Sequence, residues 1–571
     1  MPDKMKFETP NLTAENLKKL SELFPGVVAE GKVNVDLLRS YVGEEIFKDE
    51  AYEFTWVGKR AAVAEAGRPI RKTLRPAPDE SRDWDTTENL YIEGDNLDVL
   101  KLLQESYLGK VKMVYIDPPY NTGNDFVYRD DFAQSREKYD EEAGVCDEDG
   151  DRLFRNTETN GRFHSDWCSM IYPRLVLARN LLREDGVIFI SIDDGELSVL
   201  RKICDEVFGE SNFRNTILTR RRVKSLNSQF ADNGLYSMNV GFEYVLVYTK
   251  SPTFLMKALR MKKDNVPTKG RWDVFWSNAD RPTMRYDVLG FTPETGQWRN
   301  SKEKADIAVA NYRKYQAEFE SRMTLEEYSE KTGITDFIRR IPNATGKNGG
   351  VQHWVAPSDT SLRTSNWTDI EVSQIGKEID VPFDNPKSKQ LLMELVKLAD
   401  LKDADIVLDF FSGSATTAHA VMQLNAEDGG KRKFIMVQLP EVCAEGSEAA
   451  KAGYKNICEI GKERIRRAGD KIKEENKDKP GIENLDIGFR VLKLDDTNMN
   501  DVYYAAGETT QEMLAGMESN IKPDRTDMDL LFGCLLDWGL PLSMPHTHEK
   551  IDGFTVHTYN GGDLIACFDE H

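Results

Sequence analysis

The sequence predicts an α/β protein with one parallel sheet that is split by a long insertion. Residues 87–213 and residues 376–490 each alternate strand and helix, and their strands are apolar throughout. Strands of that kind belong to parallel sheets whose two faces are both covered by helices. Residues 214–375, between the two segments, are irregular and rich in Arg, Trp and Asn. One sheet assembled from two separate stretches of chain is therefore the expected architecture.

The spacing of the apolar residues places the individual elements. In the first half we expect, in chain order, a strand at 90–93, a helix at 97–105, a strand at 111–116, a helix at 167–182, a strand at 187–192 and a helix at 203–208. In the second half we expect a helix at 388–399, a strand at 406–409, a helix at 416–424, a strand at 433–438 and a long basic helix near 451–475. A further strand at 244–248 lies inside the irregular region and is expected to return to the sheet.

The other parts of the chain differ in composition. Residues 1–86 form an N-terminal extension that contains a Pro- and Arg-rich stretch at 67–78, which predicts an extended linker. Residues 121–165 lack periodicity and are rich in acidic residues, so we expect a mobile lid. Residues 491–571 form an acidic C-terminal domain for assembly.

Composition excludes several classes of protein. Of the 571 residues 40% are hydrophobic and 10% aromatic, which is enough for a core and excludes global disorder. No apolar run approaches the roughly 18 residues that span a bilayer, and the polar N-terminus lacks the apolar core of a secretory signal. The seven Cys residues are scattered without a CxxC pair, which argues against disulfides and structural zinc. We expect a soluble, cytoplasmic protein without membrane contact.

One pair of potential metal ligands remains. His164 and Cys168 have the i, i+4 spacing that places two side chains on one face of a helix. Because no second ligand pair accompanies them, no metal site is expected.

Charge is distributed unevenly, although the whole chain carries a net charge of −21. From Arg214 to Lys269 there are eleven Lys and Arg residues and three acidic ones, whereas from Val491 to His571 there are four basic residues and fifteen acidic ones. The first stretch suits a phosphate backbone, and the second suits a protein partner. Either run is also compatible with an ordinary solvated surface.

The first chemical motif follows the strand at 111–116. The tetrapeptide Asp117–Tyr120 lies at the carboxyl edge of the sheet, where open α/β sheets bind their ligands. Its two prolines, Pro118 and Pro119, stiffen the turn and leave the carbonyls and the carboxylate free to accept hydrogen bonds. Such acceptors can hold both protons of a planar amino group and turn its delocalised lone pair toward an electrophile, while Tyr120 stacks on the ring. The alternative is an ordinary Pro-rich turn.

The second motif is the turn after the strand at 406–409. The residues that carry it are Asp409, Phe411, Gly413 and Ser414. A strand that leads through a Gly-containing turn into a helix lets the backbone approach a nucleotide-like ligand closely. One such turn is a weak signal, and its pairing with the first motif strengthens it.

Together the two motifs resemble those of the S-adenosylmethionine-dependent amino methyltransferases of DNA. The amine motif precedes the cofactor motif with an insertion between them, an order that resembles the β class. The modification (Mod) subunits of type III restriction-modification systems have segments similar to residues 89–97, 114–123, 437–441 and 461–467. The resemblance covers most of residues 40–470. It implies a Rossmann-like methyltransferase sheet, circularly permuted, with a target-recognition region inserted at 214–375.

The resemblance also implies roles for single residues. Asp117, Pro118 and Tyr120 would grip the target adenine, with Pro119 stiffening the turn. The residues that would line the cofactor are Asp95, Asn96, Lys387, Asp409, Phe411, Gly413, Ser414, Gln438 and Glu441. Asp95 and Asn96 would approach the adenine of the cofactor, Gln438 and Glu441 its ribose, and Lys387 its methionine moiety. Many relatives carry Gly where Ala415 stands, so the backbone approach there is expected to be less close.

The implied function is transfer of a methyl group from S-adenosyl-L-methionine to N6 of an adenine flipped out of double-stranded DNA. The insertion would contact phosphates and guanines through Arg281, Arg285, Arg299, Arg339 and Arg340, and its tryptophans mostly form a core. The expected partners are a second copy of the chain and a Res (helicase and nuclease) subunit. Two alternatives stay open. One is cytosine-N4 methylation, which more often goes with Ser in place of Asp117, and the other is an idle DNA-recognition scaffold for a nuclease.

Overall fold

The computed structural model divides into two compact units. It describes residues 9, 11–24, 27–29, 32–35, 38, 53–122, 128–129, 153–154, 162–221, 238, 240–263, 265–372, 379–383, 386–500 and 520–569. The first unit combines residues 1–257 with residues 365–571, and the second is Ala258–Thr364. Most of the predicted lid at 121–165 lies outside the described residues.

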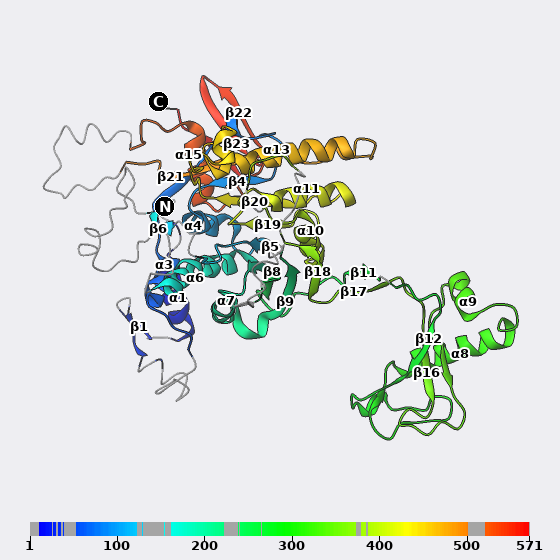
Figure 1. Cartoon of the computed structure of the whole chain (residues 1–571). Coiled ribbons are helices and arrows are strands. Elements are labelled where there is room, and N and C mark those ends of the chain that lie inside the picture. The colour runs from blue at the N-terminus through cyan, green and yellow to red at the C-terminus, as the bar shows by residue number, and fades with distance from the viewer. Residues whose placement is uncertain are drawn as a thin grey trace, which may run out of the picture. The chain divides into compact units, whose positions relative to one another are not determined.

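A ten-stranded sheet forms the centre of the first unit (Figure 1). Its strand order is β18-β9-β10-β8-β5-β19-β20-β4-β21-β3. In that order the strands are Asn366–Glu371, Phe213–Arg220, Phe242–Thr249, Leu182–Ile192, Val111–Ile116, Ile406–Asp409, Lys433–Gln438, Leu90–Glu93, Arg490–Asp496 and Lys72–Pro76. The six strands from β8 to β21 are parallel, whereas β10 and β3 are antiparallel to their neighbours.

Strands from the two halves of the sequence alternate in this sheet. β19 and β20, which come late in the chain, lie between β5 and β4, which come early. All six residues of β5 are buried, as are all four of β4, because both faces of the central sheet are covered. The predicted α/β fold with one sheet built from two stretches of chain is thereby confirmed.

Helices cover both faces because the crossovers run in opposite directions. α4 (Asn96–Tyr107) and α6 (Phe163–Leu181) connect strands toward β8, and they pack on each other. α11 (Thr416–Asp428) and α13 (Ile457–Glu475) connect strands toward β21 and also pack on each other. Since crossovers between parallel strands are right-handed, the two pairs lie on opposite faces. α10 (Lys389–Leu398) joins the second pair by packing on α11.

One sequence expectation about local structure is wrong. The stretch at 67–78, expected as a linker, starts at the last residue of α3 (Lys59–Gly67) and contains the edge strand β3, which pairs antiparallel with β21. Pro76 is tolerated there because it is the last residue of an edge strand. Residues 203–208, expected to be helical, are helical: they comprise the end of α7 (Leu197–Cys204) and a π-helical turn at Asp205–Gly209.

The ends of the chain add smaller elements to the first unit. They are α1 at Leu12–Leu23, β1 at Val28–Ala29, β2 at Lys32–Val33, α15 at Asp527–Asp537, β22 at His546–Ile551, β23 at Phe554–Tyr559 and β24 at Leu564–Cys567. Short elements inside the chain are β6 at Tyr128–Arg129, β7 at Leu153–Phe154 and α12 at Glu448–Lys451. Among the helices that the structure describes, none has the length and apolar character needed to cross a membrane.

The second unit has its own cores. Its strands are β11 at Arg260–Lys262, β12 at Arg271–Val274, β13 at Trp276–Ser277, β14 at Gln297–Trp298, β15 at Ile338–Arg340, β16 at Val351–Val355 and β17 at Thr360–Leu362. Its helices are α8 at Lys302–Glu318 and α9 at Leu325–Thr332. Trp298 centres one apolar cluster and Trp354 belongs to another. Of the inserted range 214–375, the strands β9, β10 and β18 belong to the large sheet instead.

Candidate functional site

The candidate site lies at the carboxyl edge of the large sheet. β4, β20, β19 and β5 are parallel neighbours, so the residues after their last positions meet at one edge. That edge brings together Asp95 after β4, Gln438 at the end of β20, Asp409 at the end of β19 and Asp117 after β5. The two motifs found in the sequence therefore belong to adjacent strands.

Two hydrogen bonds fix the backbone of the amine motif and of the residue that follows it. The indole N–H of the fully buried Trp167 on α6 donates to the carbonyl of Pro119 at 2.8 Å. Asn121, directly after the motif, donates to the buried carboxylate of Glu196 at 2.6 Å. These bonds fix the turn while leaving the carboxylate of Asp117 partly exposed, at 27%.

Three polar side chains, of Tyr120, Glu243 and Lys387, surround that carboxylate. The Tyr120 hydroxyl lies 2.9 Å from the Asp117 carboxylate and 3.1 Å from that of Glu243, and its single proton can go to either. The Lys387 ammonium lies 3.1 Å from Asp117, 3.0 Å from Glu243 and 2.6 Å from the Tyr120 hydroxyl. Two carboxylates, one ammonium and one phenol thus form a closed hydrogen-bonded group.

Burial and neighbouring charge set the ionisation of this group. Burial raises the pKa of Asp117, the Lys387 ammonium opposes that rise, and Glu243 adds to it. Burial lowers the pKa of Lys387, but the Asp117 and Glu243 carboxylates outweigh burial and hold it above its usual value. The pKa of Tyr120 is raised far above its usual value by burial and by the same two carboxylates. The phenol therefore stays protonated and the amine stays charged.

Lys387 and Phe383 link the two motifs. The sequence placed Lys387 beside the cofactor, whereas the structure places its ammonium against Asp117 and Tyr120. It is the Phe383 ring, four residues earlier, that lies against the cofactor turn, 3.4 Å from where a Cβ on Gly413 would stand. One short segment thus reaches both the amine motif and the cofactor motif.

Sequence reasoning missed Glu243. It stands in the middle of the basic stretch and was counted there only as an opposing charge. Because β10 runs antiparallel to β8, its first residues start at the carboxyl edge, and Glu243 becomes buried beside Asp117. An acidic residue at the start of an apolar strand is the signal that could have found it.

The cofactor turn is built around a buried carboxyl. Asp409, 2% exposed, accepts from the Thr417 hydroxyl at 2.5 Å and from the Phe411 N–H at 3.1 Å. Burial raises the pKa of Asp409 to about 7, against the lowering effect of these two bonds. Gly413 has a φ of +50°, and its N–H donates to the Gln438 side chain at 2.7 Å. Ser414 accepts from Arg464 on α13 at 2.9 Å.

A second buried arginine, Arg174 on α6, orders the neighbouring strand end. Its guanidinium donates to Asn96 at 2.5 Å and to Asp95 at 3.3 Å. Asp95 also caps α4, and Asn96 donates to the carbonyl of Phe410 at 2.8 Å. These contacts join the end of β4 to the cofactor turn. Arg174 was not predicted, because a buried arginine inside an apolar helix pattern gives no separate signal.

The two remaining expectations for the cofactor side concern Glu441 and Ala415. Glu441 is exposed in the segment after β20, and its carbonyl accepts from the N–H of Ile457. Ala415 is fully buried with a φ of +60°, a left-handed conformation that costs a residue with a Cβ about 1–2 kcal/mol. That conformation is the physical reason why glycine suits this position.

His164, one of the two potential metal ligands, contacts an acidic side chain. Its ring lies 2.5 Å from the carboxylate of Glu196, which also accepts from Asn121. In the part of the chain that the structure describes, no group of three or more His, Cys, Asp or Glu side chains is arranged to hold a metal ion.

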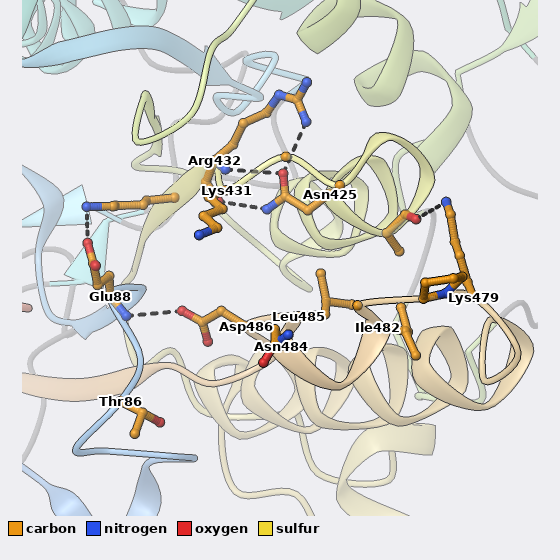
Figure 2. A pocket seen from close by; sticks show the side chains of 16 residues that line it. Thr86, Glu88, Asn425, Lys431, Arg432, Lys479, Ile482, Asn484, Leu485 and Asp486 are labelled. Atoms are coloured by element: carbon orange, nitrogen blue, oxygen red, sulfur yellow. Dashed lines mark hydrogen bonds and ion pairs between the residues drawn. The ribbon is translucent and has the colours of Figure 1, made fainter.

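A cavity of about 370 Å³ lies at the opposite, amino edge of the sheet (Figure 2). Lys433 at the start of β20 pairs with Glu88, and Lys479 donates to the carbonyls of Ala426 and Glu427 at the end of α11. These contacts tie the segment after α13 to α11. The length of β20 separates this cavity from the candidate site, so the cavity is no part of it.

The basic residues expected to contact DNA have defined partners where the structure describes them. In the first unit Arg220 pairs with Glu371, and Arg221 lies 3.6 Å from Glu243, while Arg222 lies outside the described residues. In the second unit Arg339 stacks on Trp272 at 4.1 Å. Backbone carbonyls accept hydrogen bonds from the guanidinium groups of Arg285, Arg299 and Arg340. Arg281 is exposed.

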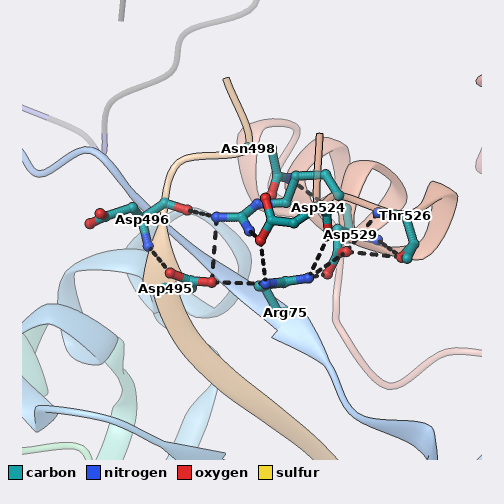
Figure 3. Close-up of polar contacts among 8 residues, drawn as sticks. Arg75, Asp495, Asp496, Asn498, Asp524, Thr526 and Asp529 are labelled. Atoms are coloured by element: carbon teal, nitrogen blue, oxygen red, sulfur yellow. Dashed lines mark hydrogen bonds and ion pairs between the residues drawn. The ribbon is translucent and has the colours of Figure 1, made fainter. Parts of the chain in front are cut away.

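The acidic C-terminal segment is tied to the N-terminal strand of the sheet (Figure 3). Arg75 on β3 donates to Asp529 of α15 at 2.9 Å and pairs with Asp495 of β21 at 3.1 Å and with Asp524 at 3.2 Å. Arg525, whose side chain is 3% exposed, pairs with Asp524 and Asp495. Much of the local negative charge is therefore balanced inside the chain.

The apolar face of α15, inside the segment that was expected to serve assembly, packs within this chain. Leu531 and Leu535 are fully buried in the core of the first unit, where α15 packs on β3 and α4. A helical pattern shows that a face is apolar, but not which surface covers it. Trp538, at the end of the helix, is 56% exposed.

The fold and the two facing motifs define an α/β methyltransferase of the kind that acts on an amino group. The sequence model of the DNA methylase family matches residues 111–468. The Mod subunit of the type III restriction-modification enzyme StyLTI of Salmonella typhimurium is 34% identical over 82% of this chain and 68% of its own length. The EcoPI Mod subunit of Escherichia phage P1 is 32% identical over 90% and 81%, and the EcoP15I Mod subunit of Escherichia coli is 30% identical over 90% and 81%.

The chain belongs to the DNA methylase family and, within it, to the Mod subunits of type III restriction-modification enzymes. It is a DNA methyltransferase, and its cofactor is S-adenosyl-L-methionine, as the sequence predicted. Mod subunits of this kind act on DNA and pair with Res subunits in general.

Proposed function

We propose that this chain transfers a methyl group from S-adenosyl-L-methionine to N6 of an adenine in double-stranded DNA. The observation that carries the proposal is the Asp117 carboxylate, partly exposed at the carboxyl edge and one strand away from the cofactor turn. A carboxylate, rather than a serine hydroxyl, accepts strongly from an exocyclic amine. The rigid turn beside it presents further acceptors and an aromatic ring.

The residues at the edge fit the cofactor. Among the described residues, a Cβ on Gly413 would meet within 4 Å only the Phe383 ring, which leaves space beside the turn for a ligand. Asp95 and Asn96, fixed by Arg174, and Gln438, fixed by the turn, offer polar groups for a nucleoside. Glu441 is the expected ribose contact and would have to approach from its exposed position. When bound, the cofactor supplies an electrophilic methyl group on a sulfonium.

The chain contributes positioning and electrostatics. Asp117 and the carbonyl of Pro118 accept the two N–H protons of the amine, so the lone pair of N6 points out of the base plane toward the cofactor turn. The Tyr120 ring lies against the base and Pro119 keeps the turn stiff. Asp117 is also the nearest base that can take the proton that N6 releases after transfer. Because the amine lies inside a duplex, the base must first leave the stack.

Recognition and assembly are assigned to other surfaces. The second unit, with 18 Lys and Arg against 14 Asp and Glu, reads the target sequence together with the basic stretch from Arg214. We also propose that two copies of the chain work as a homodimer, that a Res subunit binds this dimer, and that the enzyme acts in the cytoplasm. The support is the similarity to Mod subunits over most of their length.

One experiment separates this proposal from its alternatives. DNA treated with the chain and S-adenosylmethionine is digested to nucleosides, and mass spectrometry identifies the methylated one. N6-methyl-2′-deoxyadenosine is expected. N4-methyl-2′-deoxycytidine would replace the proposal by cytosine methylation, and no methylated nucleoside, with DNA binding intact, would leave a recognition scaffold. Sequencing that detects modified bases then gives the target site.

A further inference from the structure

We propose that Lys387 holds the place of the target amine on Asp117 before DNA binds, and that Glu243 retains Lys387 when the amine takes over. This inference rests on the proposed function, because it concerns the same carboxylate. Both residues act by positioning, and neither is assigned contact with the transferred methyl group.

Lys387 satisfies Asp117 as an amine would. An ammonium has three N–H donors, and three oxygens surround this one, from Asp117 at 3.1 Å, Glu243 at 3.0 Å and Tyr120 at 2.6 Å. Without the lysine, this partly buried carboxylate would have, among the described residues, only the Tyr120 hydroxyl as a donor, shared with Glu243, and would carry a desolvation cost. The lysine removes that cost in the free protein. An incoming adenine amine can then replace the Lys387 ammonium as a donor to Asp117. The Asp117 carboxyl is already ionised and does not have to lose a proton first.

The members of this hydrogen-bonded group differ in how far they are exposed to solvent. The side chain of Asp117 is 27% exposed, whereas those of Lys387 and Glu243 are 12% and 8% exposed. A base that enters the site therefore meets Asp117 first. Lys387 can withdraw only toward Glu243, which keeps it paired, and Tyr120 stays within reach of both carboxylates. The exchange costs the lysine one of its three bonds.

The titratable groups that face Asp117 come from several elements. They are Lys387 before α10, Glu243 at the start of β10, Tyr120 in the motif, Tyr115 on β5 and Asp409 at the end of β19. Behind Glu243 stands Arg221, 3.6 Å from its other oxygen, and Asp193 lies in the same electrostatic group. Glu243 therefore has a second cation beside it when Lys387 moves.

The test is how the pH dependence of Asp117 changes in Lys387→Met. In the free protein, difference infrared spectroscopy against Asp117→Asn detects the protonated carboxyl. Loss of the cation should move the midpoint of its protonation upward by roughly one pH unit or more. The acid limb of kcat/KM reports the free enzyme and should move by the same amount, whereas the acid limb of kcat reports the complex and should stay in place.

The companion variant is Glu243→Gln. With one anion fewer, Asp117 should protonate at a lower pH than in the wild type, which is the opposite direction. Lys387 then binds Asp117 alone, so the adenine amine competes less well and KM for DNA should rise about tenfold. Matched controls are Lys101→Met and Glu65→Gln, which break a buried ion pair of 2.7 Å on the back of α4. These should leave both limbs unchanged.

Two outcomes would overturn the inference. If Lys387→Met moves the limbs of kcat and kcat/KM equally, the lysine stays on Asp117 in the complex and holds no place for the amine. If neither limb nor the infrared midpoint moves, the lysine has only a structural role. Failure of the proposed function would look different, because the wild-type chain would then form no N6-methyl-2′-deoxyadenosine in DNA while the infrared midpoints of the free protein still shifted.

Discussion

Asp117 shows how a single side chain is made ready for chemistry by what surrounds it. It sits at a strand end, on a turn stiffened by two prolines and held by the indole of Trp167. Among the described residues, its hydrogen-bond and ion-pair partners are Tyr120 and Lys387, and neither belongs to the cofactor turn. In the proposed function, holding the amine and holding the cofactor are therefore tasks of different residues.

This division makes a direct prediction for Asp117→Ala. Methyl transfer should fall on the order of 10²-fold or more, because a charged acceptor is lost from a preorganised site. Cofactor affinity, measured by calorimetric titration, should stay within a few-fold of the wild type. Gly413→Asp is the converse variant and should abolish cofactor binding through bulk and negative charge at a left-handed turn. Near-normal turnover of Asp117→Ala would contradict the role of Asp117.

Asp409 predicts a pH dependence of stability. Its pKa is about 7 in the folded chain and about 3.8 when exposed. Between these values the folded state binds a proton that the unfolded state does not, so stability falls as pH rises from about 4 to 7. The difference of about three pH units between the two pKa values corresponds to a loss of up to about 4 kcal/mol in the free energy of unfolding. Urea unfolding at several pH values should show this slope in the wild type and a flatter one in Asp409→Asn. Parallel slopes would contradict it.

Ala415 offers a stabilising substitution. Its left-handed backbone is strained for alanine, and glycine removes the strain at the cost of a more flexible unfolded chain. Ala415→Gly should therefore raise the unfolding free energy by roughly 1 kcal/mol, visible as a higher denaturant midpoint. Ala418→Gly, in the first turns of α11, is the control and should lower it. A loss of stability in Ala415→Gly would show that the turn is relaxed.

Among the elements, the strands were the most predictable. β4, β5, β19 and β20 are short apolar runs that end in polar residues, and the pattern places them within a residue or two. Glu243 was out of reach because its place depends on β10 running antiparallel, a fact of tertiary pairing. The surface that covers the apolar face of α15 could not be predicted for a similar reason, since β3, which packs on it, lies more than 400 residues earlier. The target-recognition role of residues 214–375 and the cofactor roles of single residues stay predictions.

The C-terminal elements lead to a changed expectation for truncation. An acidic domain that served only assembly could be deleted without harm to cofactor binding. In the structure β21 pairs with both β4 and β3, and α15 buries Leu535 in the core. Deletion of 491–571 should therefore prevent folding, with no cooperative melt and no cofactor binding. Leu535→Ala, a milder change, should cost about 2–5 kcal/mol. A truncated chain that melts cooperatively and binds the cofactor would contradict this.

For the whole molecule, the second unit should be separable. β11 and β17 pair antiparallel, with Arg260 opposite Leu362, so the chain enters and leaves the unit at neighbouring points. Replacing residues 260–362 by a short Gly-Ser linker should leave a folded core that binds the cofactor. Its affinity for target DNA should fall, and the salt dependence of binding should flatten, because phosphate contacts are lost. Fluorescence anisotropy at several salt concentrations measures both, and unchanged binding would place recognition elsewhere.

The strand order β5-β19-β20-β4 also has a consequence in time. β4 and β5 leave the ribosome early, but the strands that must lie between them follow about 290 residues later. At roughly 5–20 residues per second the wait lasts on the order of 15–60 s. During that interval β5 has one edge, and β4 has both edges, without the final neighbouring strand, and such an edge is a template for pairing with other chains. Protection of nascent chains in this window, and not only the stability of the finished sheet, therefore governs how much active enzyme a cell obtains.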